Sequence, residues 1–300
     1  MEDINKVREM VALRTHAVFL ANLENGSEAW KELRQTGVGG SDVGTICGFN
    51  RWSSPYTLWA QKTGKVDRDI ATSEPMEWGT RLESVILDKF EESHSELVLH
   101  REIGTWHHPE RSWQLANPDA IYELADGTLG VVEVKTATYE DDWKNGVPVY
   151  YRTQVQWYLA TFGLKHAYVV VLFHGNKYRE FEVEASDFEQ EVHLELVENW
   201  RQFVLEDREP DFDGADSTYE TVRAMHPEIS NETVELGNLG ILYYDTEQRF
   251  TAATREMNEM KSRVLAAMGN AKYGTVEDVQ CFSRQARGTG TPYLVSKSKK

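Results

Sequence analysis

The sequence has few cysteines, no long apolar run and no excess of positive charge, and each deficit excludes a class of protein. The two cysteines, Cys47 and Cys281, are too few for a disulfide framework, a four-cysteine zinc site or a four-cysteine iron–sulfur cluster. The longest wholly apolar run, residues 167–173, is well short of the roughly 20 residues that a membrane span needs. These deficits favour a soluble protein of the reducing cytoplasm.

The charge balance is acidic and uneven along the 300 residues. Thirty-two basic against 49 acidic residues give a net charge of −17, which excludes a uniformly basic nucleic-acid coat but permits a local basic groove. Residues 261–300 carry a net charge of +6 instead. Residues 207–234 are acidic and turn-rich, so we expect a linker there, between a domain over 1–206 and a C-terminal helical extension with a basic tail over 235–300.

Hydrophobic periodicity predicts alternating helices and strands before the linker. Their order indicates an α/β (α+β) domain with a central mixed sheet flanked by helices. A long amphipathic helix over 244–268 is expected after the linker. The predicted elements of the first domain are a helix at 76–90, strands at 97–106, 113–124 and 128–136, a helix at 149–162, strands at 167–173 and 178–183, and a helix from 186 to about 205.

Two of these strands are predicted to form a hairpin that gathers charged side chains. Residues 125–127 (Ala-Asp-Gly) suit a three-residue loop with the glycine in the left-handed conformation. Pairing the residues on either side of this loop places Asp119 opposite Glu133. Because strand side chains alternate between faces, Lys135 shares the face of Glu133, and the flanking valines point into a core.

Asp119 and Glu133 together form a candidate metal site. Two carboxylates about 5 Å apart repel each other unless a cation shares them. An all-oxygen donor set without histidine or cysteine suits Mg²⁺ or Mn²⁺. Such an ion activates a water and stabilises the charge of a pentavalent phosphorus, which predicts metal-dependent phosphodiester hydrolysis, with Lys135 orienting or helping to deprotonate the water. The alternative is a solvated polar face of an edge hairpin.

Two predicted helices add polar side chains to the candidate site. Glu83 lies beside the apolar stripe of the helix at 76–90 and could reach the same metal, although a solvated helix glutamate is the alternative. Gln154 and Tyr158 are four residues apart on one helix and therefore share a face. The glutamine amide could hold a phosphate or the attacking water, with the tyrosine packed beside it, and ordinary helix surface is the alternative.

A glycine-rich turn at 36–42 precedes a short helix-like segment. Free backbone N–H groups at a helix start bind anions, and Arg34 could add a bidentate phosphate contact. The alternative is a plain tight turn with Ser41 or Asp42 as the helix cap. The turn lacks the Gly-Lys-Ser/Thr ending of nucleotide-hydrolase phosphate loops, which excludes that class.

Several short motifs, taken in order, point to one family. The motifs are Arg34 with Thr-Gly-Val-Gly-Gly-Ser-Asp at 36–42, Trp-Ser-Ser-Pro-Tyr-Thr-Leu-Trp at 52–59, Lys-Thr-Gly at 62–64, Trp-Gly-Thr-Arg-Leu-Glu at 78–83, Asn-Pro-Asp at 117–119, Val-Glu-Val-Lys at 132–135 and Gln-Val-Gln-Trp-Tyr at 154–158. With these motifs the chain resembles the YqaJ-like viral recombinases, relatives of phage lambda exonuclease within the PD-(D/E)xK nuclease superfamily. The resemblance covers roughly residues 28–206.

The resemblance implies a restriction-endonuclease-like core and a role for each matching residue. The implied roles are metal binding for Glu83, Asp119, Glu133 and the carbonyl of Val134, catalysis for Asp119, Glu133, Lys135 and Gln154, support of the site for Tyr158, and 5′-phosphate binding for Arg34 and Ser41. The basic residues that could line a DNA path are Arg34, Lys62, Arg81, Lys135, Lys144 and Arg152.

The resemblance also implies an activity and its partners. Members of the family degrade one strand of linear double-stranded DNA from the 5′ end and leave a 3′ overhang for an annealing protein. We therefore expect a Mg²⁺-dependent exodeoxyribonuclease of phage recombination (Mn²⁺ being possible), which acts on double-stranded DNA ends in the cytoplasm of a bacterial host. The expected partners are a phage single-strand annealing protein and further copies of the chain, in a ring such as a trimer, with no membrane involved.

Two other functions stay open at this point. One is an endonuclease or repair nuclease of the same superfamily. The other is a non-catalytic scaffold that binds DNA ends on an inactive nuclease fold, although the presence of Asp119, Glu133, Lys135 and Gln154 argues against decay of the site. Nucleotide release that depends on a divalent metal distinguishes an enzyme from such a scaffold.

Overall fold

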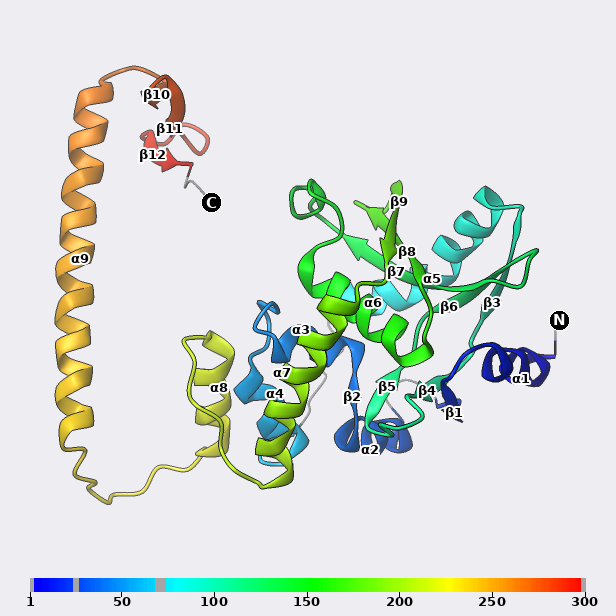
Figure 1. Ribbon diagram of the computed structural model, residues 1–300. Helices are drawn as coiled ribbons and strands as arrows, with labels where there is room; N and C mark the ends of the chain where they lie inside the picture. The colour runs from blue at the N-terminus through cyan, green and yellow to red at the C-terminus, as the bar shows by residue number, and fades with distance from the viewer. Residues whose placement is uncertain (1–2, 24–26, 68–73, 298–300) are drawn as a thin grey trace. The chain divides into compact units, whose positions relative to one another are not determined.

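The computed structural model describes residues 3–23, 27–67 and 74–297, and the chain divides into two compact units (Figure 1). The first unit is Met1–Ile229 and the second is Ser230–Lys300. None of the helices in the described ranges is both long enough and apolar enough to cross a membrane. The two units are described separately below.

The first unit contains two sheets and the helices that cover them. Its helices are α1 (Ile4–Arg14), α2 (Glu28–Thr36), α3 (Gly40–Ile46), α4 (Pro55–Lys62), α5 (Glu74–Ser93), η1 (Asp141–Trp143), α6 (Val149–Phe162), α7 (Asp187–Leu205) and α8 (Asp216–Met225). Its strands are β1 (Val18–Ala21), β2 (Val38–Gly39), β3 (Leu97–Arg101), β4 (Thr105–His107), β5 (Gln114–Ala116), β6 (Ala120–Leu124), β7 (Leu129–Ala137), β8 (His166–Phe173) and β9 (Lys177–Glu184).

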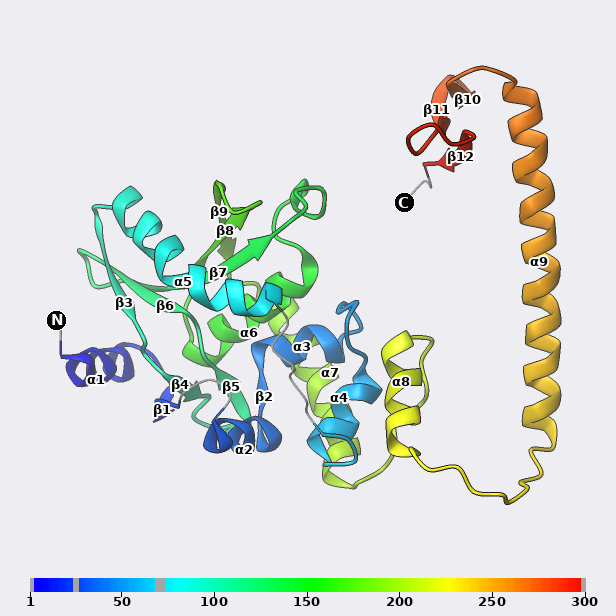
Figure 2. The same ribbon diagram turned by 180° about the vertical axis from the view of Figure 1, so that it is seen from behind.

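The larger sheet has the strand order β3-β6-β7-β8-β9, in which only the β7–β8 pair is parallel. Helix α6, backed by α7, lies on one face (Figure 1), and α5 lies across the other (Figure 2). The alternation along β7 explains the two layers. Val131 belongs to the core under α6, and Val132 and Val134 belong to the core under α5. The expected mixed sheet flanked by helices is confirmed.

A smaller sheet, with the strand order β1-β4-β5-β2, brings the glycine turn beside the larger sheet. Two of the expected strands are each divided between this sheet and the larger one. The strand expected at 113–124 is two strands, β5 and β6, separated by Asn117-Pro118-Asp119. Pro118 has no N–H to donate to a strand ladder, so regular pairing stops there. The strand expected at 97–106 is divided at Gly104, whose φ of +85° and close approach to the carbonyl of Ala21 require a glycine.

The segment 207–234, expected to be a linker, instead contains helix α8, which packs on α4. Thr218 donates a hydrogen bond to Ser54 at 2.6 Å, and the hydroxyls of Thr221 and Thr57 lie 2.9 Å apart. All four side chains are buried. The boundary between the units therefore falls after residue 229, because the threonines of α8 supply contacts that the acidic composition of the segment conceals.

The second unit consists of one long helix and a small sheet. Helix α9 (Asn238–Met268) is followed by the antiparallel strands β10 (Tyr273–Val276), β11 (Val279–Gln285) and β12 (Tyr293–Ser296), in that order across the sheet. The helix expected at 244–268 is confirmed, and it begins six residues earlier than expected. The last three residues of the basic tail, 298–300, lie outside the described residues.

Candidate active site

The β6–β7 hairpin has the register that the sequence predicts. Ala120 pairs with Val132, and Gly127 has a φ of +84° in the three-residue loop. Asp119 is the residue before β6, so continuing the register places it opposite Glu133. Its Oδ2 accepts a hydrogen bond from the backbone N–H of Val134 at 2.7 Å, which fixes the carboxylate against β7.

Glu133 is the centre of a buried polar cluster that the structure brings together from β7 and α6. Its side chain is 3% exposed. Oε1 accepts from Nζ of Lys135 at 2.5 Å and from Nε2 of Gln154 at 2.6 Å. The same Nε2 lies 3.0 Å from the hydroxyl of Tyr158, which confirms that Gln154 and Tyr158 share one face of α6. Oε2 of Glu133 is buried without a hydrogen-bond partner.

Three carboxyl groups in this cluster hold their protons more tightly than usual. Burial raises the pKa of Glu133 to about 8, and the charge of Asp119 adds to the rise. Burial likewise raises the pKa of Glu83, on α5, to about 7, again with a contribution from Asp119. The pKa of Asp119 is also raised by burial, against the opposing effect of Lys135. Glu83 therefore shares the electrostatic environment of the hairpin, as the sequence predicts.

Lys135 is the cation of the cluster. Burial acts to lower its pKa, but the carboxylates of Glu133 and Asp119 outweigh burial and raise it. Its Nζ also lies 4.9 Å from the centre of the Tyr151 ring. Because the pKa is raised, the side chain is an ammonium at neutral pH.

The donor chemistry of the cluster fits a hard divalent cation. Across the described residues, no three histidine, cysteine, aspartate or glutamate side chains already lie close enough together to hold a metal ion. The partnerless Oε2 of Glu133 and the raised pKa values of Glu83, Asp119 and Glu133 nevertheless indicate three carboxyl groups whose combined negative charge Lys135 does not balance. Oxygen donors alone suit Mg²⁺ or Mn²⁺, and these three side chains, with the main chain of Val134, are the groups that could hold it.

Arg34 and Ser41 lie together beside this cluster. Nη2 of Arg34 donates to Oγ of Ser41 at 3.0 Å, and Nε of Arg34 is buried without a partner. A cavity of about 70 Å³ lies against Arg34, Gly39 and Tyr158, so one tyrosine borders both groups of residues. The close approach explains Gly39, because a Cβ atom there would lie 1.9 Å from Nη1 of Arg34.

Sequence reasoning missed the buried pair that supports Arg34. Oδ1 of Asp42 accepts from Nη2 of Arg34 at 2.8 Å, and Oδ2 lies 3.1 Å from Nζ of Lys62. Nζ of Lys62 also donates to the carbonyls of Arg34 and Gly37, both at 2.6 Å. From the sequence, Asp42 is a helix-cap candidate within the glycine-turn motif and Lys62 is a candidate for the DNA path, and neither pattern reports that the two side chains form a buried pair.

The expected basic DNA path is largely neutralised in the structure. Lys62 is 2% exposed and serves the fold. Arg81 pairs with Glu77 at 2.6 Å, and Lys144 pairs with Asp141 at 2.9 Å. Three further ion pairs, Arg34–Asp42, Lys135–Glu133 and Arg152–Glu189, occupy the remaining candidates. These acidic partners come from other elements or adjacent turns, so the sequence alone does not report them.

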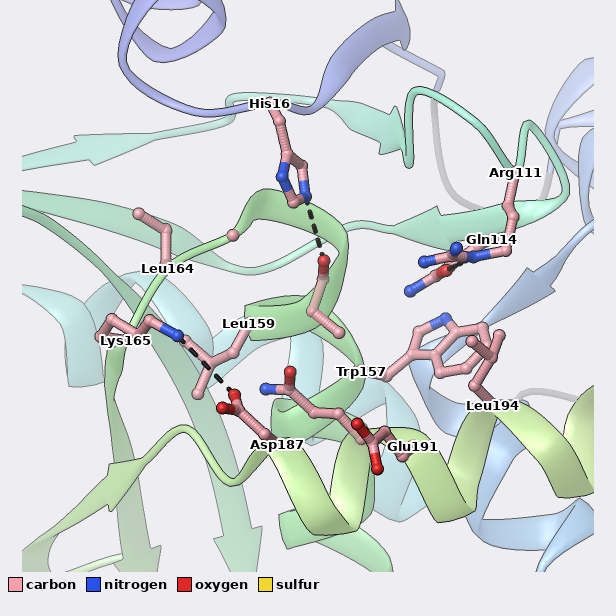
Figure 3. A pocket seen from close by; sticks show the side chains of 13 residues that line it. His16, Arg111, Gln114, Trp157, Leu159, Leu164, Lys165, Asp187, Glu191 and Leu194 are labelled. Carbon is pink, nitrogen blue, oxygen red and sulfur yellow. Dashed lines mark hydrogen bonds and ion pairs between the residues drawn. The ribbon is translucent and has the colours of Figure 1, made fainter.

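A larger cavity of about 320 Å³ lies elsewhere on the first unit, beside the ends of α6 and α7 (Figure 3). Figure 3 shows His16, Arg111 and Lys165 around it, with Lys165 near Asp187 at 3.7 Å. Among the described residues that line it there is none of the predicted site residues. Of the predicted site residues, Arg34 and Tyr158 line the smaller cavity instead.

Comparison with known proteins finds a family to which part of the chain is similar. Residues 29–165 match the family model of the YqaJ-like viral recombinase domain, and this segment includes all the predicted site residues. The uncharacterized protein YqaJ of Bacillus subtilis is 29% identical over 88% of this chain and 85% of its own length. Protein D345L of African swine fever virus (isolate Tick/South Africa/Pretoriuskop Pr4/1996) is 28% identical over 48% of each chain.

A solved structure shows the same fold. The crystal structure of an alkaline exonuclease, LHK-Exo, from Laribacter hongkongensis aligns with a TM-score of 0.50 over 61% of this chain and 95% of its own. At 19% identity this likeness concerns the fold. Residues 29–165 are thus similar to the YqaJ-like viral recombinase domain, and over 61% of its length the chain shares the fold of the alkaline exonuclease.

Proposed function

We propose that the protein is a Mg²⁺-dependent exodeoxyribonuclease that degrades one strand of linear double-stranded DNA from its 5′ end. The observation that carries the proposal is Glu133, a buried carboxylate with one oxygen unpartnered between Asp119 and Lys135. A fold maintained only for binding gains nothing from burying such a group, because Lys135 offsets only part of its desolvation cost. A catalytic centre uses perturbed groups of this kind.

The residues of the cluster divide the chemistry among them. Glu83, Asp119 and Glu133 would hold the metal, which when bound supplies an activated water and stabilises the charge on the phosphorus. Lys135 is an ammonium, so it neutralises developing negative charge and is not the proton acceptor. Gln154 is anchored to Glu133 and Tyr158, and it orients the carboxylate that faces the reacting phosphate.

The cavity beside Arg34 supports the polarity of the reaction. Arg34, which donates a hydrogen bond to Ser41, offers its guanidinium to a cavity of about 70 Å³, a size that favours a terminal phosphate over a continuing strand. Tyr158 lies between this cavity and Glu133. A 5′-phosphate held here leaves the strand entering the carboxylate cluster from its 5′ end, so the product is a 3′ overhang.

The proposal extends to partners and setting. A 3′ overhang is the substrate of a single-strand annealing protein, so we propose such a protein of phage recombination as the partner. A ring of several copies, such as a trimer, would keep the enzyme on its DNA during successive cleavages. The setting proposed is the cytoplasm of a bacterial host.

The test is digestion of linear duplex DNA labelled separately at the 5′ and 3′ ends, with Mg²⁺ and with a chelator. We expect Mg²⁺-dependent release of the 5′ label, a remaining 3′ overhang and intact closed circles. Cleavage of closed circles would establish an endonuclease instead. Binding of ends with no nucleotide release under Mg²⁺ or Mn²⁺ would establish the non-catalytic scaffold.

A further inference from the structure

Helix α9 presents an apolar face that its own unit does not cover. None of its 31 residues, all of which the structure describes, is buried. Phe250 is 73% exposed, Leu239 68% and Tyr243 65%. An isolated helix gains most of its stability from burying an amphipathic face, so a helix of this length with such side chains exposed indicates a missing partner.

The exposed side chains follow a seven-residue repeat. One series recurs every seven residues as Tyr243, Phe250, Met257 and Val264, which are the a positions of the repeat. A second series, the d positions, follows three residues after each a position, and Leu239 starts it one turn earlier. Alternating steps of three and four residues keep both series on one side of a helix, which is the pattern of a two-stranded coiled coil.

The side chains of the two series differ in size, and this difference favours one relative direction of two paired helices. Large side chains fill the a positions, whereas Thr246, Ala253 and Ala267 stand at three of the d positions. In a parallel pair, a meets a and d meets d, so the ring layers of Tyr243 and Phe250 would alternate with the small layers of Thr246 and Ala253. In an antiparallel pair, a meets d, and the central layers each combine a large side chain with a smaller one.

We propose that α9 pairs with α9 of a second copy of this chain as an antiparallel two-stranded coiled coil. Phe250 then packs on Ala253 of the partner subunit, and Met257 packs on Thr246 of the partner subunit. Tyr243 likewise meets Met260 of the partner subunit. Because each contact occurs twice about a two-fold axis, the interface is closed and self-complementary.

The flanking charges agree with this arrangement. Arg249 and Glu256 precede Phe250 and Met257, which places them at the g positions beside the apolar seam. Antiparallel helices bring g positions together, so Arg249 faces Glu256 of the partner subunit, once on each half of the interface. No like-charged pair arises at these positions. A second copy therefore satisfies both the layer sizes and the charges of the face.

The first test is the mass of the full-length chain in solution by light scattering. Phe250→Glu places a charge in both central layers, and Gln248→Glu makes the same charge on the outer face of α9 as the matched control. We expect Phe250→Glu to halve the mass of the assembly and Gln248→Glu to leave it unchanged. Equal masses for wild type and Phe250→Glu would overturn the proposal, whatever contacts the first unit makes.

The second test is disulfide trapping, which reports the orientation. In a background with Cys47→Ala and Cys281→Ser, the double variant Arg249→Cys/Glu256→Cys should form an interchain disulfide under mild oxidation. The double variant Glu256→Cys/Lys261→Cys, which is matched to a parallel pair, should not. Trapping of only the second variant, or of neither, would overturn the antiparallel coiled coil.

Discussion

Glu133 illustrates how one side chain links the stability of the fold to its chemistry. Its Oε1 is satisfied by Lys135 and Gln154, and its Oε2 is buried without a partner. A pKa raised to about 8 means that the folded chain favours the protonated carboxyl. A glutamine at this position keeps the acceptor oxygen and removes the charge.

Glu133→Gln should lower cleavage by at least about 100-fold, and it should lower the melting temperature of the metal-free protein at pH 8 because the buried Lys135 ammonium loses its nearest counter-charge. The measurements are nucleotide release with Mg²⁺ and thermal unfolding in chelator. Glu182→Gln, an exposed carboxylate on β9, is the control and should change neither quantity. Near-normal cleavage by Glu133→Gln would remove this residue from the metal site.

The raised pKa values of Glu83 and Glu133, about 7 and about 8, predict a pH dependence. Because both are raised above their ordinary value, the metal-free fold loses stability as pH rises from about 4.5 to about 8. Metal binding needs the deprotonated groups, so the affinity for Mg²⁺ should increase over the upper part of that range and binding should release protons. Calorimetric titration in two buffers of different ionisation enthalpy measures both effects, and a pH-independent affinity would contradict the prediction.

Arg34→Lys tests the cavity beside the cluster. A lysine keeps the charge but cannot donate to Ser41 and a phosphate from one planar group, so we expect the preference for 5′-phosphorylated over 5′-hydroxyl ends to narrow by about 10- to 100-fold. The ratio of kcat/KM on the two substrates is the measurement. An unchanged ratio would show that the phosphate binds elsewhere.

At the scale of secondary-structure elements, the sequence predicts features that depend on local patterns and misses contacts between distant residues. The three-residue loop and the alternation of valines predict the β6–β7 register, because both signals are local. The Asp42–Lys62 pair joins residues 20 apart through a buried contact, and no local pattern reports it. Helix α8 was missed for a related reason, since its buried threonines look like loop residues in an acidic segment.

The packing of α3 on α6 can be tested at Gly40. A Cβ atom there would lie 2.7 Å from the Tyr158 ring and 3.0 Å from the backbone oxygen of Gln154. Gly40→Ala should therefore destabilise the fold by about 1–3 kcal/mol and reduce kcat, because Gln154 is displaced from Glu133. Gly79→Ala, whose Cβ would only touch Thr136 at 3.6 Å, is the control and should be neutral or stabilising. Wild-type stability of Gly40→Ala would contradict this account.

For the whole molecule, the position of the boundary between the units has consequences for truncation. A chain of residues 1–229 keeps α8 and should retain cleavage. A chain of residues 1–206 loses the hydrogen bonds of Thr218 and Thr221 to buried partners on α4 and its cap, at about 1 kcal/mol each, and should unfold at lower denaturant. Denaturant titration of both chains, with cleavage measured in parallel, distinguishes this boundary from one at 206.

The buried Asp42–Lys62 pair determines how the cavity beside Arg34 treats the wrong end of a DNA strand. The guanidinium is already held in place before anything binds, so it cannot swing out to water when a phosphate is missing. Nε of Arg34 is already enclosed and unsatisfied before DNA binds, so an end with only a hydroxyl leaves this cost in place, whereas a phosphate can remove it. Discrimination of this kind works by relief: the correct end removes a cost that the rigid arginine carries in the free protein, and the incorrect end does not.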